Sequence, residues 1–286
     1  LDINTHGGNI TLGGGNSLGT GYAIGEDISD RTEGIRIDKI LNLNSEGGNI
    51  LLKGKTSTRS ESTSGYGNSG FGIYYLNSAG LIDSGTGTIT IEGINQNATS
   101  YTDYSSGIVF ALNNNNKTTI TSSSTVSSAI QIIGKGTGTH RYVFGMEVET
   151  SSPLSIVATG DGGGISLSTG QSSTSTINKY DFIARSTLEV LAKDGPITMT
   201  SIEGGSQEGI LQFTSLPYFG SRAGSSITES SSDILIQHDK FIWGSNEPQI
   251  ATTGQVAIQP FNNSFTNNPL ETDWFGFNKN GQIMSG

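Results

Sequence analysis

Gly7-Gly8-Asn9-Ile10-Thr11-Leu12 returns 40 residues later as Gly47-Gly48-Asn49-Ile50-Leu51-Leu52. In both copies a glycine-rich turn leads into an apolar residue, a variable residue and a second apolar residue, which is the two-residue period of a β-strand. Gly87-Thr88-Ile89-Thr90-Ile91 and Gly163-Gly164-Ile165-Ser166-Leu167 are weaker copies. The chain is therefore repetitive, and the content of one repeat predicts the architecture.

Three classes of apolar dyad fill each repeat of about 37 residues. The first class recurs at intervals of 32 to 41 residues, with one last member 22 residues later: Ile10/Leu12, Ile50/Leu52, Ile89/Ile91, Ile130/Ile132, Ile165/Leu167, Ile197/Met199, Ile234/Ile236 and Val256/Ile258. The second class comprises Ile35/Ile37, Ile73/Tyr75, Ile108/Phe110, Met146/Val148, Phe182/Ala184, Leu211/Phe213 and Ile242. The third class comprises Leu41/Leu43, Leu81, Ile120, Leu154/Ile156, Leu188/Val190, Ile227 and Ile250.

Three short strands in every repeat predict an all-β fold, a right-handed parallel β-helix (β-solenoid) of seven to eight coils over residues 1–260. One coil cannot bury its dyads alone, but stacked coils pair their backbones and line up their apolar residues as columns. Residues 261–286 are rich in asparagine and aromatic residues. They predict an irregular loop that folds back on the solenoid, or a continuation into a further repeat.

Two other architectures fit less well. A seven-bladed β-propeller needs four strands per blade, whereas three are visible in each repeat. An antiparallel sandwich would favour two-residue hairpin turns, which are not evident. Disorder is disfavoured because the apolar residues are regularly spaced despite the low hydrophobic content of 33%.

Composition excludes several classes of function. The chain has no cysteine, so it can form neither a disulfide scaffold nor a Cys-ligated metal site. A net charge of −10 argues against a nucleic-acid partner, which requires a basic surface. No apolar run is long enough to span a membrane as a helix. Because Leu1-Asp2-Ile3 already reads as a third-class strand, we expect an internal fragment of a longer repeat protein.

Most aromatic residues of the second class are predicted to stack in the core. Tyr74 and Tyr142 stand at outward positions and are the candidates for binding a glycan or a protein partner. The outward first-class column, which reads Thr11, Leu51, Thr90, Gln131, Ser166, Thr198, Leu235 and Ala257, is too irregular for an ice-binding face.

No catalytic residue, metal site or cofactor is predicted. The outward positions of the second strand read Arg36, Tyr74, Val109, Glu147 and Ile183, which is not the acidic column of a β-helix lyase or hydrolase. Two acidic groups, Glu147/Glu149 with Asp161 and Asp181 with Arg185 and Glu189, are interpreted as solvated surface. The histidines His6, His140 and His238 are too far apart for a metal motif, and structural or solvated roles are expected.

The Gly-Gly-Asn-Ile-x-Leu repeats and Gly254-Gln255-Val256-Ala257-Ile258-Gln259-Pro260 resemble the β-helical repeats of filamentous haemagglutinin-like exoproteins and autotransporter passengers. They are most similar to large bacterial β-strand-repeat surface proteins. This resemblance implies a secreted, cell-surface protein that acts in adhesion or as an extended stalk. The leading hypothesis is therefore a structural and adhesive segment of an extracellular fibre or filament, not an enzyme, with a host or environmental glycan or protein as receptor. Self-association end to end or side by side is also expected. The alternative is a polysaccharide lyase or glycoside hydrolase on the same scaffold.

Overall fold

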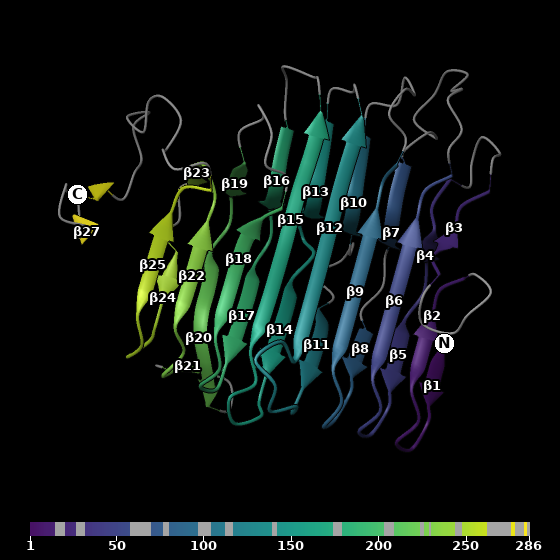
Figure 1. Cartoon of the computed structure of the whole chain (residues 1–286), viewed down its shortest axis with the longest axis horizontal. Coiled ribbons are helices and arrows are strands. Elements are labelled where there is room, and N and C mark those ends of the chain that lie inside the picture. Colours follow the sequence, from purple (N-terminus) through teal and green to yellow (C-terminus); the bar gives the residue numbers. More distant parts are fainter. Residues whose placement is uncertain are drawn as a thin grey trace.

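The computed structural model describes residues 1–14, 21–26, 32–57, 70–76, 80–96, 104–111, 117–138, 142–173, 179–202, 209–223, 226–228, 230–243, 248–261, 276–277 and 283–284. No helix occurs in these ranges, and the strands stack side by side along one axis (Figure 1). Three strands from each repeat go to three different sheets, and successive repeats add one strand to each sheet. The predicted all-β parallel solenoid is therefore confirmed.

Each sheet collects one of the three dyad classes. Sheet I contains β2(Ile10–Leu12), β6(Ile50–Lys55), β9(Ile89–Ile94), β12(Ile130–Gly138), β15(Ile165–Ser173), β18(Ile197–Ser201), β22(Ile234–Gln237) and β25(Val256–Gln259), with β3(Ala23–Ile24) beside β6. Sheet II contains β4(Ile35–Ile37), β7(Gly70–Leu76), β10(Tyr104–Ala111), β13(Tyr142–Val148), β16(Lys179–Ala184), β19(Ile210–Phe213) and β23(Lys240–Trp243). Sheet III contains β1(Asp2–Asn4), β5(Leu41–Asn44), β8(Gly80–Asp83), β11(Thr118–Ser122), β14(Leu154–Ala158), β17(Leu188–Ala192) and β20(Pro217–Ala223), with β24(Gln249–Ile250) parallel to β20 and β21(Ser226–Thr228) antiparallel to it.

The coils are most regular in the middle of the solenoid. In about five coils, from β6 to β20, all three strands have four or more residues, and the flanking coils have shorter strands. This count is slightly below the seven to eight coils that the dyads predict. The loop or further repeat expected for residues 261–286 falls mostly outside the described part of the chain. Within the described part of this segment, β26(Gly276–Phe277) pairs antiparallel with β27(Ile283–Met284).

The core consists of the stacked dyads. Ile50, Ile89 and Ile130 occupy consecutive positions in one register column, and all three are buried. In sheet II the rings of Tyr75 and Phe110 stack with their centroids 5.1 Å apart. Each buried aliphatic or aromatic side chain removed from water contributes about 1.5–3 kcal/mol, so the columns hold neighbouring coils together.

Three dyad assignments were wrong by one residue or one strand. In β8 the buried residue is Ile82, which pairs with Leu43 and Ile120, whereas Leu81 is 40% exposed. Phe219 of β20 takes the third-class position that was assigned to Ile227, because β21 turns back as an antiparallel strand. In β23 Phe241, not Ile242, is in register with Leu211.

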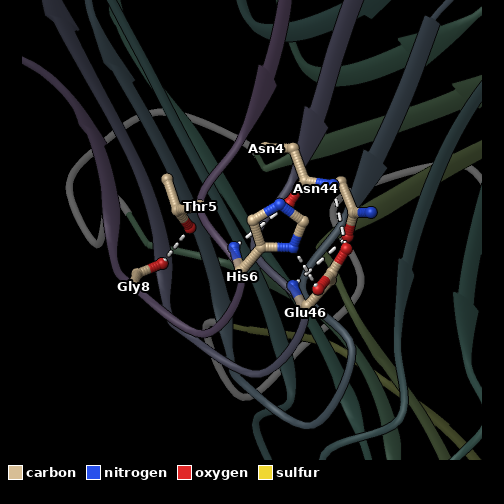
Figure 2. Close-up of polar contacts among 6 residues, drawn as sticks. All are labelled: Asn4, Thr5, His6, Gly8, Asn44 and Glu46. Atoms are coloured by element: carbon tan, nitrogen blue, oxygen red, sulfur yellow. Dashed lines mark hydrogen bonds and ion pairs between the residues drawn. The ribbon is translucent and has the colours of Figure 1, made fainter.

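The corner between sheets III and I, which lies next to the repeated Gly-Gly-Asn text, is closed by hydrogen bonds from backbone amides to asparagine side chains (Figure 2). The Oδ1 atom of Asn4 accepts a hydrogen bond from the His6 amide at 3.1 Å, and Asn44 does the same for the Glu46 amide at 3.2 Å. His6 and Glu46 adopt left-handed φ angles of 48° and 52°. Three residues after Glu46, the Asn49 side chain accepts a hydrogen bond from the Thr88 amide of the next coil at 2.9 Å. Asparagine side chains thus close the first two turns at this corner, and Asn49 also bonds one coil to the next.

Sheets I and II come into direct backbone contact along two glycine columns. Gly54, Gly93 and Gly134 are in register in sheet I and face the column of Gly72, Gly107 and Gly145 in sheet II. A Cβ atom on Gly107 would lie 2.3 Å from the Lys135 amide nitrogen and 2.6 Å from the Gly145 carbonyl oxygen. Only glycine allows this close approach of two backbones. The main core lies on one side of this contact, and a separate cluster of Phe71, Val109 and Ala111 lies on the other.

Candidate functional site

The face of sheet II that points away from the core carries the predicted outward column. Arg36, Tyr74, Val109, Glu147 and Ile183 are paired in register, as expected. Their expected exposure was wrong in the middle of the column, where Val109, Glu147 and Ile183 are at most 2% exposed. Phe71, Val109 and Ala111 form a second apolar cluster on this face, with Tyr74 and Leu76 packed against it. The outer face of sheet II therefore carries a buried apolar cluster, with the partly buried Tyr74 and Leu76 packed against it.

Tyr74 lies at the N-terminal side of this surface, between an aromatic and a cationic neighbour. Its ring centroid is 4.6 Å from that of Phe71 and 5.7 Å from the guanidinium carbon of Arg36. Arg36 is held by Glu33 at 3.3 Å and by Asp38 at 2.8 Å. Tyr74 is only partly buried, so part of this side chain is exposed beside Phe71 and Arg36.

Burial, together with nearby carboxyl groups, makes the Tyr74 hydroxyl harder to ionise. Burial, followed by the negative charge of Glu149, raises the pKa of the Tyr74 hydroxyl to about 12. Burial also raises the pKa of the Glu149 carboxyl, and it raises that of Glu33 against the opposing effects of its own backbone amide and of Arg36. The site therefore offers a neutral phenol and two carboxyl groups, each with a pKa above its ordinary value.

Tyr142 belongs to a different part of sheet II. Its ring lies 6.4 Å from that of Phe144, which in turn stacks on Tyr180 at 5.8 Å. Val143 is level with Gly70 across β10, so Tyr142 and Tyr74 are five residues out of register and two strands apart. With a rise of about 3.3 Å per residue and about 4.8 Å between strands, the two tyrosines are roughly 19 Å apart and do not form one site.

The acidic groups singled out in the sequence do not form the expected clusters. Glu147 is buried in an ion pair with Arg185, whose guanidinium also covers the Phe144 ring at 5.5 Å. Asp161 pairs with Lys193, and Glu189 pairs with Lys117 at 2.6 Å. Solvation explains the exposed Asp161, but it was the wrong interpretation for Glu147 and for Asp181, which is 1% exposed.

The histidines are also separated. His6 is exposed and contacts Glu46 at 2.8 Å (Figure 2). His238 is buried beside Asp181. His140 lies outside the described residues. Among the residues that the structure describes, no three His, Asp or Glu side chains are placed to hold a metal ion.

Sequence reasoning missed the contribution of Phe71 to the Tyr74 site. Strict alternation places residues 71 and 74 on opposite faces, but Gly72 interrupts the alternation where the two sheets touch. Gly145 does the same for Phe144 and Glu147, which both contact Arg185. The glycine inside each pair, Gly72 or Gly145, was the sequence feature that could have indicated a break in the alternation.

The chain matches no protein-family model, and it shows no significant similarity to a curated protein or to a solved structure. The described ranges also contain no helix that is long and apolar enough to cross a membrane.

Proposed function

We propose that this chain is a structural and adhesive segment of an extracellular bacterial surface fibre, and that it is not an enzyme. The observation that supports contact with a partner is the Tyr74 ring, oriented by Phe71 and Arg36 on the outer face of sheet II. The stacked coils supply the rigid support that such a surface needs, because every strand of sheet II is paired to its neighbours. A secreted, cell-surface location belongs to the same proposal.

A glycan suits the chemistry around Tyr74. Aromatic rings pack against the apolar faces of sugar rings, while a few polar groups fix the orientation of the ligand. Here Asp38, Glu149 and the Tyr74 hydroxyl would hydrogen-bond to sugar hydroxyl groups. Tyr142 and Tyr180 would form a second, weaker contact on the same sheet.

A glycan array compares the unmodified chain with Tyr74→Ala, Tyr142→Ala and the control Tyr218→Ala. Tyr218 points outward from sheet III, between Glu189 and Gln249 in register, and so tests loss of an aromatic residue elsewhere. We expect Tyr74→Ala to weaken binding by about tenfold or more, the loss of one well-placed ring. Equal binding by Tyr74→Ala and Tyr218→Ala would contradict the assignment of the surface.

The second candidate is a glycan lyase or hydrolase at the same place. It is favoured by Glu33 and Glu149, whose raised pKa values suit an acid catalyst. Incubation with a polysaccharide that binds would release reducing ends or unsaturated products, and Glu149→Gln would abolish their release. Bound polysaccharide that stays intact over a day supports the adhesive function instead.

A further inference from the structure

The two glycine columns end in a buried polar cluster. In sheet I the column Gly54, Gly93 and Gly134 continues in register as Thr169 and Ser201, and then reaches His238, because Thr200 pairs with Gln237. In sheet II the place of Gly145 is taken by Asp181, which lies between the pairs Phe144–Tyr180 and Met146–Phe182. The last coils therefore replace a backbone contact by ionisable side chains.

Asp181 and His238 face each other inside this cluster. The Oδ2 atom of Asp181 lies 3.4 Å from Nδ1 of His238, and the two side chains are 1% and 0% exposed. The Phe241 ring stands edge-on to the imidazole at 6.3 Å. Gly209 closes the cluster, because a Cβ atom there would lie 2.8 Å from Asp181 Oδ2 and 2.9 Å from Ser201 Oγ.

Among the described residues, few other polar groups interact with the pair. The Ser201 hydroxyl and the Gln171 backbone amide are neutral and favour the charged form of Asp181. Asp239 is the third ionisable group of the cluster, and its Oδ2 atom accepts the Gly209 amide at 3.2 Å. The described parts of β15, β18 and β19 contribute no ionisable side chain, while Tyr180 and Lys240 are partly exposed.

We propose that Asp181 and His238 form a proton-binding site that holds one shared proton in the native state and makes the packing of the last three coils depend on pH. A pair without a titratable proton would bury a carboxylate beside the neutral imidazole, the Ser201 hydroxyl and the Gln171 backbone amide, none of which carries a balancing charge. A pair with two titratable protons would place an imidazolium beside a neutral acid. Both are costly in a site without water contact. Burial raises the pKa of the Asp181 carboxyl, against the opposing effects of His238, the Ser201 hydroxyl and the Gln171 backbone amide.

The direction of the pH dependence follows from counting protons. In the unfolded chain an aspartate loses its proton near pH 4 and a histidine near pH 6.5, approximately. A native pair that keeps its proton at pH values where both groups of the unfolded chain have lost theirs binds more protons than the unfolded state above about pH 6.5. Stability therefore falls as pH rises above that value, with up to a tenfold change in the unfolding constant per pH unit.

Urea unfolding of the whole chain from pH 4 to pH 9 tests the proposal. Asp181→Asn leaves a buried imidazole that is best neutral, so stability should instead rise with pH up to about pH 6.5 and then level off. His238→Gln leaves a buried acid, so stability should fall from about pH 4 upwards. The control His6→Gln removes the exposed pair of Figure 2 and should leave the profile above pH 6.5 unchanged.

A second measurement needs no substitution at the pair. The carboxyl ¹³C resonance of Asp181 and the imidazole ¹⁵N resonances of His238 report the proton directly in the unmodified chain. We expect the Asp181 carboxyl to titrate above the range of an unstructured aspartate, together with a change at His238. Independent titration of the two groups at unperturbed values, or identical profiles for the unmodified chain and Asp181→Asn, would overturn the proposal.

Discussion

Phe71 and Tyr74 place their ring centroids 4.6 Å apart, although they lie three residues apart in one strand. Regular alternation would send them to opposite faces of sheet II. Gly72, between them, lies against the backbone of sheet I and interrupts that alternation. The same glycine that brings two sheets together thus also assembles the aromatic part of the candidate site.

Substitution of Gly107 by alanine should be strongly destabilising. Its Cβ would overlap the Lys135 amide and the Gly145 carbonyl, so sheets I and II would have to separate. We expect a loss of about 2–4 kcal/mol in urea unfolding, which is typical of severe overpacking. Gly7→Ala is the control, because Gly7 has a φ of 98° but no atom near its Cβ position. A loss for Gly107→Ala no larger than for Gly7→Ala would contradict the close contact.

The corrected register of β8 can be tested with two neighbouring residues. Ile82 is fully buried, so Ile82→Ala should cost about 2–5 kcal/mol of unfolding free energy. Leu81 is 40% exposed, and Leu81→Ala should cost under about 1 kcal/mol. The reverse order in thermal or urea unfolding would restore the sequence-based assignment of Leu81 to the core.

Loss of the Asn49 side chain should weaken the bond between the first coils. Its Oδ1 atom accepts both the amide and the hydroxyl of Thr88, at 2.9 Å and 3.0 Å. Asn49→Ala should cost about 1–2 kcal/mol, and amide exchange at Thr88 should become faster. Asn49→Asp keeps an acceptor oxygen and should retain most of the protection. Equal exchange of the Thr88 amide in the unmodified chain and both variants would show that the Asn49 side chain does not protect it.

Arg185 and Glu147 should show strong coupling. Arg185→Met leaves the Glu147 carboxylate, which is 2% exposed, without its cation, and roughly 3 kcal/mol of stability should be lost. The double variant Arg185→Met with Glu147→Gln removes the unpaired charge and should recover a large part of that loss. Additive effects of the two single changes would rule out a direct ion pair.

Tyrosine ionisation gives an independent check of the Tyr74 environment. The phenol pKa of about 12 lies above the usual value, so the proton is held more tightly in the native state. The associated stability is present below pH 10 and is lost as pH rises through about 12. Absorbance near 295 nm should show one fewer late-ionising tyrosine in Tyr74→Phe. If Tyr74→Phe shows the same absorbance change at high pH as the unmodified chain, the late-ionising groups are other tyrosines.

The repeat and the strand period were enough to predict three stacked parallel sheets, because dyads such as Ile50/Leu52 and Ile89/Ile91 recur with the spacing that one coil requires. The same reasoning placed Tyr74 on the outer face, since it alternates with the buried Ile73 and Tyr75. Neither result needs a distant contact, because stacking repeats pair each strand with the next one along the chain.

Only the tertiary structure determined what lies where two sheets meet. Gly72, Gly107 and Gly145 look like ordinary strand glycines, and Asp181 looks like a solvated acid, until sheet I is placed against them. His238 reaches Asp181 from 57 positions further along the chain, two coils away. Local periodicity specifies which face a residue occupies, but the burial and charge of that residue depend on the element opposite it.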